Sequence, residues 1–198
     1  QSQHIRYAGK SSSRGEPCYW TVRIWPALSG VEGNEKGVTS PWARPALWTW
    51  FDKAETKDWQ AKWITDNTSS PWLRQSLQLN APPERAHLYI NALGYFQLFI
   101  NGERVEHDEF APHVGQYNKR TFCVTYDVTK YLKKGQNAIG FWLGSGWNLG
   151  GAGVKTTPSV RAQLEVADAK GEITTFATDE TWRAKASSMA HRGGWGWN

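Results

Sequence analysis

The stretch 86–105 constrains the fold more than any other part of the sequence. Apolar and polar residues alternate over 86–92, and a second alternation follows over 96–100. A period of two residues is that of a β-strand, whose successive side chains point to opposite faces. The stretch runs directly into Asn101-Gly102, a dipeptide that favours the positive φ angles of a type I′ turn. We therefore predict an antiparallel hairpin that closes over 103–105.

Similar alternating segments follow at short intervals along the chain. They cover 73–79, 122–126, 138–143, 160–166, 173–177 and 182–186, with Gly, Pro, Asn and Asp residues between them. Asp127 and Thr129 are placed to cap a single helical turn, and 160–166 is the most clearly amphipathic strand. Many short strands with almost no helix predict an all-β fold, an antiparallel β-sandwich or jelly roll.

Residues 1–58 look incomplete as a domain. One strand is predicted over 18–24, and a loop rich in Gly and Pro follows it. The tryptophan-rich segment 48–63 fits either a short helix over 53–62 or an irregular linker that tryptophans anchor on a sheet. We predict a partial β segment with a linker over 1–58 and a sandwich domain over 59–198, truncated at its C-terminus.

Composition excludes several classes of protein. The net charge of +5 comes from scattered basic residues, and nucleic-acid binding needs them clustered. No apolar run is long enough to predict a membrane span, so we expect a soluble protein, whether cytoplasmic, periplasmic or secreted. Cys18 and Cys123 fit no zinc site and are predicted to be thiols, although the sequence leaves a bridge between them open. The 13 tryptophans favour β structure and sugar binding.

No catalytic motif is present in the sequence. A glycosidase needs two carboxyl groups that face each other across a sugar. The pairs Asp108-Glu109 and Asp179-Glu180 are neighbours in sequence, so their side chains point apart on a strand, and Asp127 is expected to be a cap. We predict no catalytic residue in this chain.

Two loops are the candidate binding regions, because loops that join sandwich strands are where such folds bind ligands. One spans 111–120 and the other, which is rich in glycine, spans 144–155. Four residues with stacking rings or amide groups are the predicted sugar-binding set: Tyr117, Asn118, Trp147 and Asn148. The same loops offer oxygen atoms of the kind that Ca²⁺ binds, and His113 is left as a polar loop residue. The alternative is that both loops only pack against a neighbouring domain.

Several segments together resemble a known family. In order they are WQAKWI, INALGYFQLFINGERV, FAPHVGQYNKRTF, TYDVTKYLKKGQNAIG, LGSGW and TDETWRA. They resemble the N-terminal region of bacterial α-L-rhamnosidases of glycoside hydrolase family 78, and the resemblance covers 59–198. Residues 17–58 more loosely resemble a fibronectin-like segment, and the sandwich is distantly similar to galactose-binding-like jelly rolls. One departure is Ala111-Pro112-His113-Val114, where the family usually has APGW.

This resemblance implies a non-catalytic accessory module of an enzyme that removes terminal α-L-rhamnose from glycosides or polysaccharides. In that family an inverting pair of carboxylates lies on a downstream (α/α)₆ barrel, so no catalytic residue carries over, and we expect this chain alone to be inactive. Some members hold a Ca²⁺-dependent rhamnose site in the sandwich. The expected partners are a rhamnose-containing glycan and the catalytic barrel, with no cofactor required and Ca²⁺ as an option. Two alternatives remain: a free-standing, Ca²⁺-dependent lectin-like module, and a purely structural domain.

Overall fold

The computed structural model describes residues 8–10, 16–24, 39–49, 59–105, 108–149 and 157–189, without the side chains of Thr49, Trp147 and Leu149. It divides into two compact units, Gln1–Asp58 and Trp59–Asn198. In the described part of the chain, no helix combines the length and the apolar character that crossing a membrane requires.

The first unit holds a small antiparallel pair. Strand β1 (Pro17–Trp20) pairs with β2 (Ala46–Thr49), with Cys18 opposite Trp48. Beyond β1, the backbone N–H of Ala43 donates to the carbonyl of Val22 at 2.8 Å. The sequence predicted a strand over 18–24, and the observed strand ends at Trp20. It did not predict β2, because four residues are too few to show a period. The fibronectin-like character of this unit stays a prediction.

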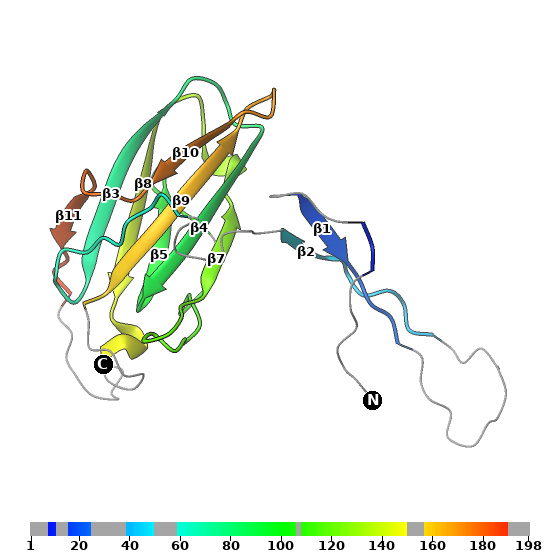
Figure 1. Cartoon of the computed structure of the whole chain (residues 1–198), viewed down its shortest axis with the longest axis horizontal. Coiled ribbons are helices and arrows are strands. Elements are labelled where there is room, and N and C mark those ends of the chain that lie inside the picture. Colours follow the sequence, from blue (N-terminus) through cyan, green and yellow to red (C-terminus); the bar gives the residue numbers. More distant parts are fainter. Residues whose placement is uncertain are drawn as a thin grey trace, which may run out of the picture. The chain divides into compact units, whose positions relative to one another are not determined.

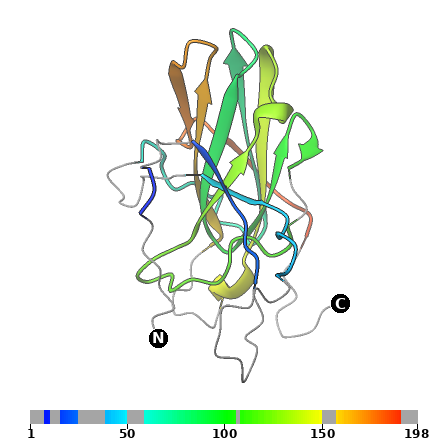
Figure 2. The ribbon, with the colours of Figure 1, turned by 90° about the vertical axis from the view of Figure 1, so that its right-hand side faces the viewer.

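The second unit is a sandwich of two antiparallel sheets (Figures 1 and 2), which confirms the predicted all-β fold. The four-stranded sheet has the order β10-β9-β4-β7, and the five-stranded sheet has the order β11-β3-β8-β5-β6. The strands are β3 (Pro71–Leu79), β4 (Arg85–Leu93), β5 (Tyr95–Ile100), β6 (Glu103–Arg104), β7 (Cys123–Asp127), β8 (Gly135–Gly144), β9 (Ser159–Ala167), β10 (Ile173–Ala177) and β11 (Arg183–Ala186). Two 3₁₀ turns accompany them, η2 (Thr129–Tyr131) and η3 (Gly146–Leu149).

The stretch that opened the sequence argument belongs to both sheets. Strand β4 lies in the four-stranded sheet and β5 in the five-stranded one, and Gly94 alone separates them. Gly94 has φ +104°, and a Cβ atom there would lie 2.3 Å from the carbonyl oxygen of Gly144. Only the second half of the stretch forms the predicted hairpin: β5 pairs with β6 through Asn101 and Gly102, with φ angles of 53° and 86°. These positive angles are those of the predicted turn.

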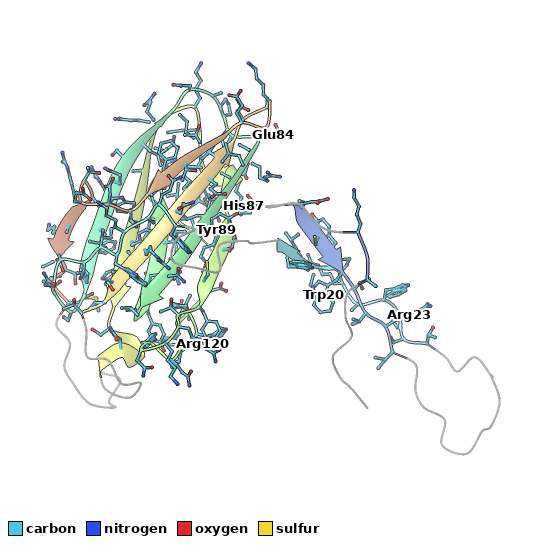
Figure 3. The ribbon with its side chains drawn as sticks, in the orientation of Figure 1. Trp20, Arg23, Glu84, His87, Tyr89 and Arg120 are labelled. Carbon is cyan, nitrogen blue, oxygen red and sulfur yellow. The ribbon has the colours of Figure 1, made fainter. Side chains whose placement is uncertain are left out.

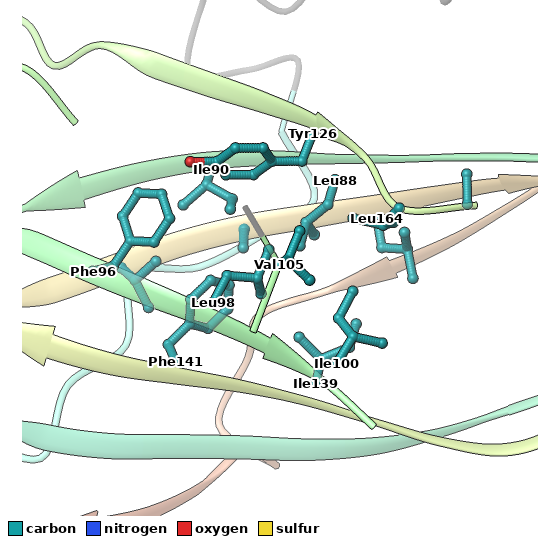
Figure 4. Close-up of a cluster of buried hydrophobic side chains, with 14 of the residues drawn as sticks. Leu88, Ile90, Phe96, Leu98, Ile100, Val105, Tyr126, Ile139, Phe141 and Leu164 are labelled. Carbon is teal, nitrogen blue, oxygen red and sulfur yellow. The ribbon is translucent and has the colours of Figure 1, made fainter. Parts of the chain in front are cut away.

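The core lies between the two sheets (Figure 4). Leu88 and Ile90 of β4 face Leu98 and Ile100 of β5, and all four side chains are at most 2% exposed. Aromatic rings fill the end of the core near the start of β5. The ring of Phe96 meets those of Phe141 and Tyr126 edge to face, with centroids 6.1 and 6.4 Å apart.

The polar side of β9 is buried, which its amphipathic sequence did not predict. Gln163 is fully buried, and its side-chain oxygen accepts a hydrogen bond from the backbone N–H of Gln60 at 3.0 Å. Segment 59–64 runs across this sheet, since Ile64 pairs with Val160 and Trp59 and Trp63 flank Arg161. Residues 59–63 therefore form the irregular tryptophan-anchored segment rather than a helix, and residues 53–58 lie outside the described part.

Candidate functional site

Loop 111–120 and the described part of the second loop, residues 144–149, lie at the same end of the sandwich, where β4 passes into β5 (Figures 1 and 2). The loop 111–120 is held there because the backbone N–H of Phe96 donates to the carbonyl of Ala111 at 3.0 Å. The second loop begins at the end of β8, where the hydroxyl of Ser145 donates to the carbonyl of Ser69 at 3.2 Å. Arg120, labelled in Figure 3, lies at this end of the sandwich. We call the region formed by Tyr95, residues 110–120 and residues 144–149 the loop end.

Tyr95 joins the two loops, and sequence reasoning missed it. A Cβ atom on Gly146, in the second loop, would lie 2.7 Å from the Tyr95 ring, so the backbone of that loop sits against the ring. The ring of Phe110, just before the first loop, lies 5.4 Å from that of Tyr95. Phe110 is 54% exposed, so its ring is available to a ligand. The sequence feature that could have pointed to Tyr95 is its position directly after Gly94, at the start of a strand and on the outward side of that strand.

Tyr117 contributes a hydroxyl group to the loop end. The side chain is half-buried, and its hydroxyl oxygen is buried with no hydrogen-bond partner among the described residues. Burial raises the pKa of this hydroxyl, and the nearby Tyr95 raises it further. The group is therefore a neutral phenol at physiological pH, able both to donate and to accept a hydrogen bond. A buried polar atom of this kind needs an explanation, and a ligand hydroxyl is one.

Asn118 stands at the tip of the first loop. The backbone N–H groups of Lys119 and Arg120 both donate to the carbonyl of Gln116, at 2.6 and 2.7 Å, which closes a tight turn around Asn118. The side chain of Asn118 is exposed. Its amide group is open to solvent, and its predicted role in sugar binding stays a prediction.

The other two predicted residues lie in η3. The backbone N–H of Asn148 donates to the carbonyl of Ser145 at 3.0 Å, and its side chain is only 1% exposed. Asn148 therefore lies inside the loop end rather than on its surface. The side chain of Trp147 and residues 150–156 lie outside the described part. In the described geometry, Phe110 and Tyr117 lie close to Tyr95. Asn118 follows Tyr117 in the chain, and these four residues are the candidate sugar contacts.

The Ca²⁺ site suggested for the two loops stays a prediction. Ca²⁺ takes six to eight oxygen ligands, with carboxylates prominent among them. Across the described residues, no group of three or more Asp, Glu, His or Cys side chains is placed to hold a metal ion. Glu109, next to the first loop, instead pairs with Arg104 at 3.0 Å. The described side chains of the loop end carry amide and hydroxyl groups, which can donate hydrogen bonds to the hydroxyls of a sugar and accept them from it.

A cleft of about 450 Å³ lies elsewhere, between β3 and β10. Its floor consists of core side chains such as Leu77, Leu88 and Leu164, and Gln75, Asp179 and Trp182 stand among its other lining residues. Trp182 uses one ring face to stack on Phe141, at 5.7 Å. The cleft also has polar lining residues such as Gln75 and Asp179, but the loop end holds the predicted sugar-binding residues and is therefore our candidate site for a sugar.

Taken together, the two antiparallel sheets and their strand order define an antiparallel β-sandwich. The model of the alpha-L-rhamnosidase N-terminal domain matches residues 81–195. The chain belongs to this family.

Relatives and solved structures agree with this assignment. An alpha-L-rhamnosidase of Formosa agariphila is 32% identical over 93% of this chain, and one of Alteromonas sp. (strain LOR) is 30% identical over 92% of it. The alpha-L-rhamnosidase structure from Dictyoglumus thermophilum has a TM-score of 0.70 at 28% identity, covering 93% of this chain and 22% of its own. The Streptomyces avermitilis alpha-L-rhamnosidase complexed with L-rhamnose has a TM-score of 0.56 at 34% identity, covering 59% and 12%. The chain spans 21% of the length of each of the first two relatives.

Proposed function

We propose that this chain is the non-catalytic N-terminal portion of an α-L-rhamnosidase and that its loop end binds L-rhamnose. The whole protein would hydrolyse terminal α-L-rhamnosyl linkages of glycosides or polysaccharides, with its catalytic groups on an (α/α)₆ domain beyond this chain. The observation that carries the proposal is the family match over 81–195. The structure in complex with L-rhamnose belongs to a relative with the same sandwich.

The loop end has the chemistry that a deoxy sugar requires. The exposed ring of Phe110, supported by Tyr95 at 5.4 Å, offers an apolar surface to the C–H face and methyl group of the sugar. The Tyr117 hydroxyl and the Asn118 amide offer hydrogen bonds to its hydroxyl groups. We propose that these neutral contacts bind the sugar without a cofactor, and Ca²⁺ is an addition to be tested.

Calorimetric titration of the chain with L-rhamnose tests the binding site. We expect saturable heat at millimolar sugar that persists in EDTA. Phe110→Ala should abolish most of this heat, and Tyr117→Phe, which keeps the ring, should weaken binding about tenfold through the lost hydrogen bond. Ile173→Ala is the control, because Ile173 on β10 is exposed to a similar extent, 51% against 54%.

The contrary outcomes are distinct. Heat that EDTA abolishes would mean that calcium is required, whereas no heat at all would leave the sandwich a structural role. Hydrolysis of a nitrophenyl α-L-rhamnoside should be absent for this chain alone. Nitrophenol release that persists through purification would overturn the non-catalytic assignment.

A further inference from the structure

The outer face of the five-stranded sheet carries aromatic rings in mutual contact. Trp72 of β3 and Trp142 of β8 are directly opposite in the sheet, and their rings stack with centroids 4.7 Å apart and planes 12° apart. The ring of Phe99 of β5 lies 5.8 Å from that of Trp72. We call these three residues the aromatic platform.

Gly140 makes this platform possible. It lies on β8 between Arg74 of β3 and Phe99 of β5 in the register of the sheet. Because Gly140 has no side chain, the rings of Trp72 and Phe99 can approach each other across β8. A Cβ atom at Gly140 would meet only the carbonyl oxygen of Leu73, at 3.6 Å, so the fold itself tolerates a side chain there.

The platform is also rigid and open. The indole N–H of Trp142 donates to the hydroxyl of Ser70 at 2.9 Å, which fixes the ring. Trp72 is nonetheless 38% exposed. Rigid aromatic side chains lose little conformational entropy on binding, and their faces pack on the C–H faces of sugar rings. Gln97, opposite Trp142 on β5, adds an amide group at the edge of the platform.

Positive charge lines the side of the platform formed by β3 and β11. These two strands contain the basic residues Arg74, Arg183 and Lys185 and no Asp or Glu, and β5 and β8 contain no charged residue. On the other side, Arg104 of β6 is directly opposite Phe99 and is paired with Glu109 at 3.0 Å. Lys185 is directly opposite Trp72, and Arg183 is directly opposite Arg74. In the described part of the chain, none of the three forms an ion pair. Like charges opposite each other destabilise a sheet, and a bound anion would relieve this cost.

We infer that this face binds a polysaccharide that carries carboxylate or sulfate groups. Its sugar rings would pack on the aromatic platform, and its anionic groups would lie over Arg74, Arg183 and Lys185. A protein domain docked here would have to bury three cations and supply a partner for each. A charged glycan supplies repeated anions and leaves the cations partly hydrated. The site is separate from the loop end and does not rest on the proposed function.

Affinity electrophoresis of the chain in gels that contain a polysaccharide tests the inference. The three probes are polygalacturonate, which is carboxylated, dextran sulfate, and neutral dextran. We expect retardation by at least one charged probe and none by dextran. If polygalacturonate retards the chain more than dextran sulfate does, the preferred anionic group is a carboxylate, and in the opposite case it is a sulfate. Replacing Arg74, Arg183 and Lys185 together by Gln should weaken binding at least tenfold. The matched control replaces the exposed residues Lys133, Lys134 and Lys170 by Gln, removes the same charge, and should change binding less than twofold.

The Gly140→Leu variant tests whether the aromatic platform contributes to binding or whether the polysaccharide is held by electrostatic attraction alone. The leucine side chain would separate the rings of Trp72 and Phe99 while leaving the net charge unchanged. We expect it to weaken binding of the charged polysaccharide at least fivefold. Equal binding by Gly140→Leu and the wild type, or equal losses in both triple variants, would overturn the inference. So would binding of neutral dextran with the same strength, or no binding of any probe, which would assign the face to contacts with another protein domain.

The same variants distinguish this inference from the loop-end proposal. Gly140→Leu should leave the heat of L-rhamnose binding unchanged, and Phe110→Ala should leave retardation by the charged glycan unchanged. Loss of both activities in either variant would contradict two separate sites. A far-UV circular dichroism spectrum and a thermal melt of each variant exclude unfolding as the cause.

Discussion

The two outer faces of the sandwich contrast in an unexpected way. The face of β4 and β9 is polar, with His87, Asn91 and Gln163, yet these side chains are at most 6% exposed. Figure 3 shows His87 and Tyr89 on β4, and Tyr89 is 1% exposed. The opposite face is aromatic around Trp72, which remains 38% exposed. Polarity alone therefore does not tell which face of this sandwich meets solvent.

Hydrogen bonds hold several side chains of the polar face in place. The Arg161 guanidinium donates to the side-chain oxygen of Asn91 at 3.1 Å, and the Asn91 amide donates to the carbonyl of Phe122 at 3.0 Å. The Gln163 amide donates to Glu165 at 2.8 Å. Buried polar groups that are satisfied in this way stabilise one arrangement of the covering chain. The aromatic face has no such cover in the described part of the chain, which is why we assign it to a ligand.

The largest effect is expected at Gly94, where the chain passes from one sheet to the other. Gly94→Ala would place a methyl group against the carbonyl of Gly144 and force a side chain into φ +104°. We expect a loss of at least about 3 kcal/mol of unfolding free energy, measured by urea denaturation. Gly171→Ala is the control, because φ is +83° there but nothing lies within 4 Å of the added methyl. Equal losses would show that strain in φ, rather than the close approach of the two sheets, sets the cost.

The next largest effect tests the cover of the polar face. Arg161 lies over the rings of Trp59, at 4.4 Å, and Trp63, at 5.2 Å, and it also bonds Asn91. Arg161→Ala should therefore cost about 3 kcal/mol, from two cation–π contacts and one charged hydrogen bond.

The control for Arg161 comes from the other face. Arg74→Ala removes the same type of side chain from an exposed position and should change stability by less than about 0.5 kcal/mol. Hydrogen exchange would locate the change, because segment 59–64 should lose protection in Arg161→Ala while β3 keeps it. A uniform loss of protection would contradict the cover that we describe.

His87 gives the buried face a pH dependence. Burial lowers the pKa of His87 below its ordinary value of 6.5, Arg85 lowers it further, and Asp127 and Glu165 oppose the shift. The unfolded chain therefore takes up a proton near pH 6.5, where the folded protein still does not. Stability contributed by His87 is thus complete above pH 6.5 and is lost as the pH falls through the lower folded pKa.

We expect His87→Gln to weaken the dependence of unfolding free energy on pH between 7.5 and 5. Urea denaturation at several pH values measures the slope. His113→Gln, at an exposed loop position, should leave the slope as in the wild type. A His87→Gln variant with the slope of the wild type would show that other groups set the pH dependence.

Features of the fold that depend on local sequence could be predicted, whereas features that depend on contacts between distant parts of the chain could not. Asn101-Gly102 and the alternating strands are local signals, so the hairpin and the sandwich could be predicted. The switch at Gly94 could not, because it depends on the close approach of Gly144 from a distant strand. The burial of Gln163 depends in the same way on residues 59–64. At the loop end, the sugar-binding roles of Tyr117 and Asn118 stay predictions from their chemistry. Tyr95 was not among the predicted residues, because its ring meets Gly146 and Phe110 only once distant parts of the chain come together.

The smallest effect on stability is expected on the aromatic face, with the opposite sign. Arg183→Glu replaces a like-charged pair with Arg74 by an opposite-charged one, so we expect a gain of about 0.5 kcal/mol in unfolding free energy. Added salt should reduce this gain, because it screens exposed charges. Lys133→Glu is the control, since it changes the net charge equally at an exposed turn. If Arg183→Glu raises the unfolding free energy and also weakens retardation by a charged glycan, Arg183 destabilises the fold but contributes to binding, as expected for a binding residue. A loss of stability would mean that the two arginines do not repel each other, and it would remove that argument for an anionic ligand.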